Sequence, residues 1–296
     1  MEARPADTSR KVLALGVSGG IAGAMAKTLI APLERLRLLA QTGHANPLGS
    51  MATLSAVIRN EGFRALWRGN TANVVRMVPS KCVLLACSDL YQDLFRHEHI
   101  NAFTRGGLAG ALAGGTATLC SYPLDLVRTR MAGVLITPGT PTRYHTILGT
   151  LVIIAREESV FGLFRGITPT LLGSFPYEGI KFGCYASLKH QGGEEWQQPA
   201  GKAVFGALAG TVANVLTYPN DVLRRRLQLQ GCPDIKNGVV YNGYVDCCRK
   251  VVALEGWRAL YAGLWLTVVR GIPNTGIQFG VYELCKKAFV YFDLLD

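Results

Sequence analysis

Charged residues are scarce in this chain of 296 residues: they make up 17% of it, whereas hydrophobic residues make up 49%. This balance is unusual for a soluble enzyme and indicates a membrane protein. The eight cysteines include no Cys-x-x-Cys pair, which excludes a zinc ribbon or a small disulfide framework and predicts free, mostly buried thiols. The first residues contain no apolar stretch, so we expect no cleaved secretory signal.

Basic residues exceed acidic ones, 31 to 20, and give a formal net charge of +11. This excess favours an anionic partner, which is a nucleic acid, an anionic lipid or an anionic solute. The chain has no basic soluble segment interleaved with aromatic residues, so we expect no nucleic-acid binding. The five histidines lie in or near expected loops without a common spacing, and we expect no metal site, no cofactor and no enzyme activity.

Three landmarks recur in the same order, each about a third of the chain apart. The segment 61–69 returns at 158–166 and 255–263, in steps of 97 residues, and ends each time in glycine. The other landmarks are the prolines Pro79, Pro176 and Pro273, and a Pro-x-acid-x-x-base motif that begins at Pro32, Pro123 and Pro219. We therefore expect three repeats that form one transport domain, at 11–101, 102–198 and 199–290.

Each repeat contains two long apolar stretches with a short amphipathic one between them. The long stretches lie near 11–41, 71–95, 104–132, 167–190, 200–229 and 264–290. A membrane span needs about 20 residues, so all six are long enough to cross a bilayer. The short stretches, near 51–60, 146–157 and 244–254, are expected to lie along the membrane surface.

The expected fold class is therefore an all-α membrane protein, with six transmembrane helices in three parallel two-helix repeats. The repeats are expected to surround a central cavity with pseudo-threefold symmetry, and three short surface helices complete them. The loops within repeats are richer in Arg and Lys than the loops between repeats. The positive-inside rule therefore places the loops within repeats on one face and both termini on the other.

The Pro-x-acid-x-x-base motif sets an acid and a base on the same face of a helix. Its proline kinks the span and frees backbone groups, which a water-filled cavity can satisfy. A charge at the bilayer centre costs roughly 2.5–3.5 kcal/mol on insertion scales, so six charges are not expected to face lipid. Around a threefold axis each acid can instead meet the base of the next repeat; the alternative is that the charges are solvated at the interface. The residues concerned are Glu34, Arg37, Asp125, Arg128, Asp221 and Arg224.

The three repeats, the three Pro-x-acid-x-x-base motifs and the three glycine-ending aromatic motifs together resemble the mitochondrial carrier family. The resemblance covers residues 11–290. It implies six tilted helices around a cavity that opens alternately to the two faces. It also implies a monomer in the mitochondrial inner membrane, with both termini on the intermembrane-space side; a peroxisomal or plastid membrane is the alternative.

The resemblance implies a gate of charged residues at each end of the cavity. On the matrix side it pairs Glu34 with Arg128, Asp125 with Arg224, and Asp221 with Arg37. Glutamines at Gln41 and Gln228 brace this gate, and Ala132 takes the equivalent place in the middle repeat. On the cytoplasmic side it implies Asp89, Gln92, Lys189, Glu283 and Lys286, where Asp89 with Lys189 is the only fully ionic pair. We therefore expect the matrix gate to be the stronger one and the resting protein to be open to the cytosol.

Substrate ligands are expected where the three repeats differ, because a small solute has no threefold symmetry. Such positions carry the bases Lys27, Arg76, Lys81, Lys181 and Arg270 and the single acid Glu178. The cavity is thus predicted to be cationic, and arginine forks suit phosphate or carboxylate groups. We expect Arg76 and Arg270 to be direct ligands; Lys81 with Glu178 is alternatively a structural pair. Gly173 and Ser174 offer a small neutral site for a flat ring, on which Tyr177 can stack.

These residues predict a transporter that exchanges a phosphorylated, adenine-containing anion of the adenine nucleotide type by alternating access. The segments 76–80 and 168–177 resemble the nucleotide and coenzyme A branch of the family. Coenzyme A or a related cofactor is therefore the first alternative substrate. A di- or tricarboxylate comes next, and a proton or fatty-acid leak protein on the same fold is the last alternative.

Aromatic-Arg-Gly motifs stand where the second long helix of a repeat begins, at Arg68-Gly69 and Arg165-Gly166. Free backbone N–H groups at such a helix start can bind a lipid phosphate. The family resemblance implies cardiolipin there, and at Gly263, where Ala262 replaces the arginine. The alternative is an ordinary aromatic anchor at the membrane interface.

Overall fold

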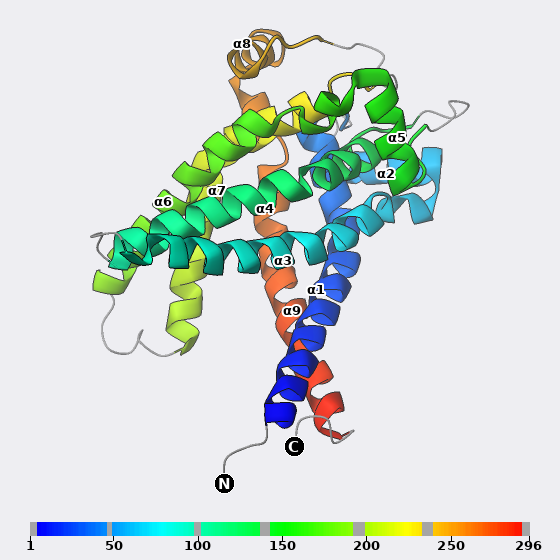
Figure 1. Cartoon of the computed structure of the whole chain (residues 1–296). Helices are drawn as coiled ribbons and strands as arrows, with labels where there is room; N and C mark the ends of the chain where they lie inside the picture. Colours follow the sequence, from blue (N-terminus) through cyan, green and yellow to red (C-terminus); the bar gives the residue numbers. More distant parts are fainter. Residues whose placement is uncertain are drawn as a thin grey trace.

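The computed structural model describes residues 5–45, 49–97, 102–136, 143–191, 199–232 and 239–291, and all regular secondary structure in these ranges is helical (Figure 1). The long helices are α1 (Pro5–Gln41), α3 (Asn70–Leu94), α4 (Ala102–Ala132), α6 (Ile167–Gln191), α7 (Pro199–Leu229) and α9 (Leu264–Tyr291). The short helices are α2 (Ser50–Glu61), α5 (Ile147–Glu158) and α8 (Tyr244–Glu255), each followed by a 3-10 turn, η1 (Phe63–Trp67), η3 (Val160–Phe164) and η5 (Trp257–Tyr261). One further 3-10 turn, η2 (Phe95–His97), follows α3. The expected all-helical class with three equivalent repeats is confirmed.

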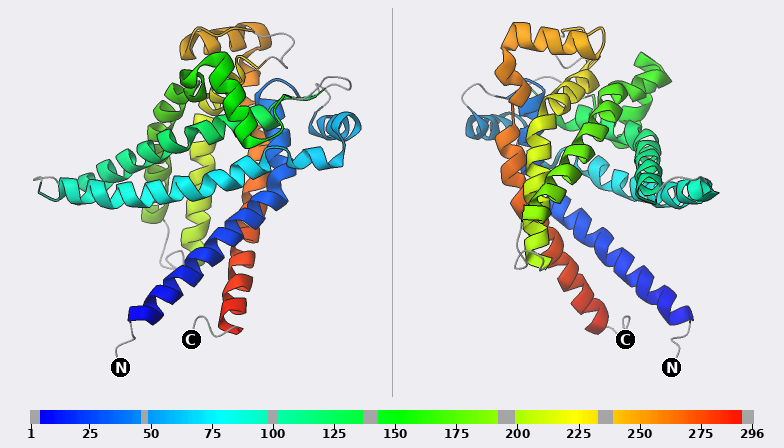
Figure 2. Two further views of the ribbon diagram at one scale, coloured as in Figure 1. Left: turned by 45° about the vertical axis from the view of Figure 1, so that its right-hand side comes forward. Right: turned by 90° about the vertical axis from the view of Figure 1, so that its left-hand side faces the viewer.

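The long helices pack in pairs that join neighbouring repeats: α3 with α4, α6 with α7, and α9 with α1. Figures 1 and 2 show these pairs fanning apart, while α1, α4 and α7 also contact one another. Helix α1 begins and α9 ends on the same side of the molecule, away from α8 (Figure 1). Within the described residues, none of the helices has a stretch both long and apolar enough to be identified by hydropathy as a membrane span.

The buried core lies where α1, α4 and α7 end and the short helices pack on them. Its largest cluster contains Leu126, Met131, Ile154 and Leu229. Large apolar side chains along the long helices, such as Leu85, are exposed instead. The protein therefore buries its apolar side chains mainly at one end of the helix pairs.

The thiols follow the same distribution as the other apolar side chains. All eight cysteines are free, as expected, but only Cys232 and Cys247 are buried. The expectation of mostly buried thiols is wrong, because cysteines such as Cys82 and Cys120 lie on helix faces that the chain itself does not cover. Burial at the short helices raises the pKa of the Cys247 thiol to about 12, so this thiol is protonated at neutral pH.

Three glycines lie where one repeat packs against the next. Gly69, Gly166 and Gly263 have φ angles of +79°, +81° and +80°, a left-handed conformation that side chains with a Cβ rarely adopt. A Cβ on Gly69 would lie 3.1 Å from the backbone oxygen of Arg128, and the other two glycines approach the backbone of Arg224 and Arg37 in the same way. Each second long helix therefore begins in close contact with the first long helix of the following repeat.

Replacing Gly69 with alanine is predicted to destabilise the fold by about 1–3 kcal/mol. The new Cβ would be strained at positive φ and would lie 3.0 Å from Ala132 Cβ. The measurement is the melting temperature of the ligand-free protein in detergent. Gly110→Ala is the matched control: its Cβ meets no atom of the described chain within 4 Å, and alanine favours a helix over glycine by about 1 kcal/mol. Equal melting temperatures for the two variants would contradict the proposed packing role.

Candidate functional site

A ring of charged residues joins α1, α4 and α7 where these helices meet. It consists of Glu34, Asp125 and Asp221 with Arg128, Arg224 and Arg37. Arg128 is paired with Glu34; Arg224 Nη2 lies 2.5 Å from Asp125 Oδ2, and Arg37 Nη2 lies 3.2 Å from Asp221 Oδ2. The structure thus brings each acid to the base of the next repeat, in the pairing that the family resemblance implies. The role of this charged ring as the matrix gate stays a prediction.

The three corners of the ring are unequal. The side chains of Asp125 and Glu34 are 4% and 7% exposed, whereas that of Asp221 is 39% exposed. Glu34 also binds Arg270 at 2.7 Å, Lys27 at 3.4 Å and the Asn73 amide at 3.2 Å. Asp221 has Arg37 as its only ion-pair partner in the described part of the chain. The corner between α7 and α1 is therefore the weakest of the three.

The two glutamines expected to brace the ring behave differently. Gln228 donates to Tyr122 Oη and to Asp125 Oδ2, each at 3.1 Å, and its oxygen accepts from Thr129 Oγ1 at 2.8 Å. Gln41 is buried, yet neither atom of its amide has a hydrogen-bond partner in the described ranges. Gln228 thus supports the Asp125 corner, while the Gln41 side chain supports no corner through a hydrogen bond in the described ranges.

A second set of buried arginines, which was not predicted from the sequence, binds the acids at the ends of the short helices. Arg35 pairs with Glu61 at 2.6 Å, Arg130 Nη2 donates to Glu158 Oε2 at 2.8 Å, and Arg226 Nη2 donates to Glu255 Oε2 at 2.7 Å. The recurring acids at 61, 158 and 255 were the signal that could have identified these pairs. The pairs fasten each short helix to the long helix before it.

The arginines expected to bind lipid are engaged by the same acids. Arg165 lies 2.9 Å from Glu158, and Arg68 lies 3.5 Å from Glu61. Lipid binding at these motifs, and at Gly69, Gly166 and Gly263, stays a prediction. In this arrangement it depends on backbone N–H groups more than on the two guanidinium groups.

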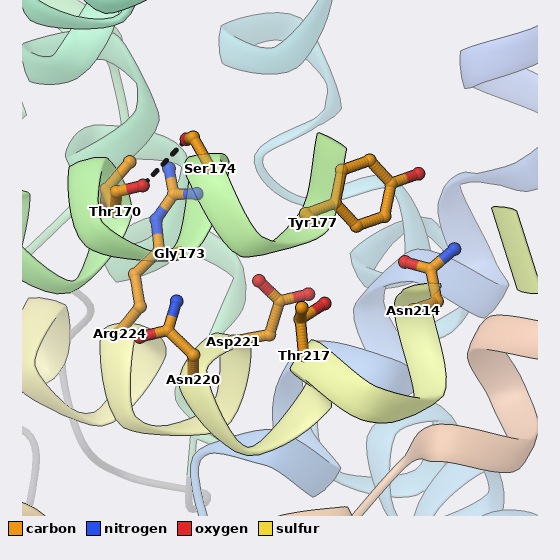
Figure 3. Close-up of a pocket in the computed structure, with 9 residues that line it drawn as sticks. All are labelled: Thr170, Gly173, Ser174, Tyr177, Asn214, Thr217, Asn220, Asp221 and Arg224. Carbon is orange, nitrogen blue, oxygen red and sulfur yellow. Dashed lines mark hydrogen bonds between the residues drawn. The ribbon is translucent and has the colours of Figure 1, made fainter. Parts of the chain in front are cut away.

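Two adjoining compartments lie next to the charged ring. The polar compartment, of about 240 Å³, is lined by Thr170, Gly173, Ser174, Tyr177, Asn214, Thr217, Asn220, Asp221 and Arg224 (Figure 3). The arginine compartment, of about 200 Å³, is lined by Arg76, Ser80, Thr118, Ser121, Tyr122, Asp125, Thr170, Ser174, Arg224 and Arg225. Because both include Thr170, Ser174 and Arg224, one elongated ligand can occupy both compartments. The lining residues that were not predicted from the sequence as substrate ligands or as members of the ring are Ser80, Thr118, Ser121, Tyr122, Thr170, Asn214, Thr217, Asn220 and Arg225.

Gly173 has a packing role that the sequence did not indicate. A Cβ there would lie 1.9 Å from Asn220 Nδ2, which donates to the Pro169 carbonyl at 2.8 Å. The space over Gly173 is thus filled by Asn220 and is not left open for a flat ring. Ser174 donates to the Thr170 carbonyl at 2.8 Å, and Tyr177 lies one turn farther along α6 (Figure 3). Tyr177 and Asn214 both line the polar compartment (Figure 3).

The structure separates the bases that were predicted to bind substrate. Arg76 lines the arginine compartment, with its Nε 3.8 Å from Asp125 Oδ1, and Lys181 Nζ lies 5.7 Å from the centre of the Tyr177 ring. Arg270 and Lys27 bind Glu34 and line neither compartment. Lys81 is exposed and lines neither compartment. The side chain of Glu178 lies outside the described residues, so its expected role stays a prediction.

The residues expected at the cytoplasmic gate lie along the spread ends of the helices. Asp89, Gln92 and Glu283 are exposed, and Gln92 donates to Ser88 of its own helix at 3.1 Å. The side chains of Lys189 and Lys286 lie outside the described residues, so the expected pair of Asp89 with Lys189 stays a prediction. The ring is thus formed at one end while the acids of the other end are exposed.

Comparison with known proteins gives a consistent picture along the whole chain. A family model described as mitochondrial carrier protein matches residues 8–99, 101–193 and 195–292. The mitochondrial coenzyme A transporter SLC25A42 of Xenopus tropicalis is 38% identical, over 91% of this chain and 84% of that protein. The protein of the same name in Danio rerio is 37% identical, over 97% of this chain and 90% of that protein. The mitochondrial carrier protein CoAc1 of Zea mays is 35% identical, over 91% of this chain and 85% of that protein.

Neutralising Asp125 is predicted to destabilise the protein far more than neutralising Asp221. Asp125→Asn leaves Arg224 and Arg225 without their acid in a buried setting, and breaking a buried pair costs about 3–5 kcal/mol. Asp221→Asn removes a partly exposed pair, and we expect it to lower the stability of the fold by about 1 kcal/mol. The comparison is made by melting temperature without ligand. A larger loss for Asp221→Asn would refute the inequality of the corners.

Proposed function

This chain belongs to the mitochondrial carrier family, and on that premise we propose that the solute it transports is coenzyme A. The family is shown by the three matched repeats and by relatives that align over nine-tenths or more of the chain. Members of this family are transporters, so the chain is a transporter and not an enzyme. Of the two substrates expected from the sequence, coenzyme A is favoured over an adenine nucleotide because the relatives from Xenopus tropicalis and Danio rerio are named as coenzyme A transporters.

The two compartments support this substrate by their chemistry. Coenzyme A carries an adenine ring at one end, a group of phosphates next to it and a long pantetheine arm. The amides of Asn214 and Asn220 and the ring of Tyr177 suit hydrogen bonding to adenine and stacking on it. Arg76 and Arg224 suit the phosphates, because a guanidinium group binds phosphate through two parallel hydrogen bonds. The shared wall allows a ligand to place its ring in one compartment and its phosphates in the other.

The charged ring supplies a way for the substrate to change the state of the carrier. Arg224 lines both compartments and also holds Asp125, so a phosphate that binds Arg224 competes directly with the ring. A ligand shifts a conformational equilibrium only through its different affinities for the two states. Substrate binding would therefore weaken the ring between α4 and α7 and favour opening at that end. Exchange of one substrate for another by alternating access follows from this competition.

Purified protein in liposomes is predicted to take up labelled coenzyme A, and faster when unlabelled coenzyme A is inside. Arg76→Gln is expected to lower uptake at limiting substrate about tenfold or more, because a hydrogen bond to a charged group contributes about 1.5–3 kcal/mol. Arg143→Gln is the matched control, since Arg143 forms a half-exposed pair with Glu157 and lines neither compartment. It is expected to transport at the rate of the unmodified protein.

The same liposomes separate the alternatives. Uptake of ATP or ADP without uptake of coenzyme A would restore the adenine nucleotide assignment, and uptake of a di- or tricarboxylate alone would contradict both. Proton conductance that needs no internal substrate would indicate a leak protein. Uptake of coenzyme A at the same rate with empty liposomes would contradict exchange while leaving the substrate assignment intact.

A further inference from the structure

Arg225 is a partly buried base that the threefold pattern of the chain does not require. It stands six residues after Pro219, and the equivalent positions of the first two repeats hold Leu38 and Thr129. Its immediate neighbour Arg224 is a member of the charged ring, whereas Arg225 has no counterpart there. A position at which one repeat alone carries a charge is suited to a ligand that itself lacks threefold symmetry.

The hydrogen bonds of Arg225 all come from one nitrogen. Its Nη1 donates to Asp125 Oδ2 at 3.1 Å, to Thr129 Oγ1 at 2.7 Å and to Gln228 Oε1 at 2.8 Å. Its Nε and Nη2 donate to no residue in the described part of the chain, and the side chain keeps 16% of its surface exposed. The guanidinium plane is therefore fixed through Nη1, while the edge formed by Nε and Nη2 stays available. That edge is the one that binds two oxygens of a phosphate.

The charge around Arg225 is out of balance. The arginine compartment is lined by three bases, Arg76, Arg224 and Arg225, and by the single acid Asp125. Asp125 already has Arg224 at 2.5 Å, and Arg76 at 3.8 Å on its other oxygen. Arg225 shares this one carboxylate with the two other arginines, so the small, otherwise polar compartment keeps an excess of positive charge. An anion with several oxygens is the ligand that restores the balance.

We propose that Arg225 is a substrate-binding residue, which together with Arg76 and Arg224 forms a three-arginine site for a phosphate group. The proposal rests on the proposed function, since it assigns the phosphates of that substrate to one compartment. It distinguishes Arg225 from the ring arginines: those close one end of the cavity, whereas Arg225 presents a free guanidinium edge to the ligand. Loss of Arg225 should therefore weaken binding more than it slows the opening and closing of the carrier.

The test uses Arg225→Thr, which places in the third repeat the residue that the second repeat already has. Affinity for coenzyme A is measured by the concentration dependence of its thermal stabilisation of the protein. In liposomes, KM and the maximal rate are measured separately. We expect affinity to fall and KM to rise by about tenfold or more, with a much smaller change in the maximal rate. Arg225→Lys keeps the charge without the fork and should give an intermediate loss.

Arg143→Gln is again the control and should keep the affinity of the unmodified protein. If the unmodified protein responds to coenzyme A and Arg225→Thr keeps the same affinity and KM, the inference is overturned and the proposed function stands. If the unmodified protein responds to no phosphorylated ligand, the proposed function itself fails. Should Arg225→Thr not yield folded protein, an unchanged affinity of Arg225→Lys overturns the assignment of the fork, and a reduced one supports it.

Discussion

Three carboxylates, Glu34, Asp125 and Asp221, hold the first long helices of the repeats together at one end of the molecule. Within the described residues they are paired with seven bases, which are Lys27, Arg37, Arg76, Arg128, Arg224, Arg225 and Arg270. Acids in this setting have to be paired, because an isolated buried charge is costly. The bases outnumber them, so the site as a whole retains positive charge. In the transport that we propose, this excess attracts the anionic substrate, which in turn competes with the carboxylates for the arginines.

The bases are distributed unequally among the three carboxylates. Glu34 and Asp125 each hold several bases, whereas Asp221 is more exposed and holds one in the described part of the chain. Gln228 supports the Asp125 corner, but Gln41 makes no side-chain hydrogen bond there. The three repeats carry the same motif, but the three ion-paired corners of the ring are therefore not equally strong. The compartments lie beside Asp125 and Asp221, so a substrate bound there as we propose would lie next to both the Asp125 corner, which has several bases, and the weaker Asp221 corner.

Much of the fold and part of the charged ring could be predicted from the sequence. The bounds of the six long helices and the three short ones follow from hydrophobic stretches and the 97-residue step, and the pairing of the ring follows from the repeated motif. Position in a repeat did not predict the contacts of single side chains. Gly173 makes room for Asn220, and Arg270 lies on Glu34 outside both compartments. Arg225 was visible only as part of a run of three arginines.

The sequence by itself determined the three repeats, the helical class, the cationic character and the family, because these depend on periodic patterns that each repeat carries in full. The tertiary structure alone decided which further bases bind the acids of the ring and which residues line the compartments. Those contacts join different repeats: Arg225 reaches Asp125 and Arg270 reaches Glu34 only after the helices have packed. Long side chains with several acceptors in reach take the partner that packing brings nearest, and spacing along the chain does not encode that choice.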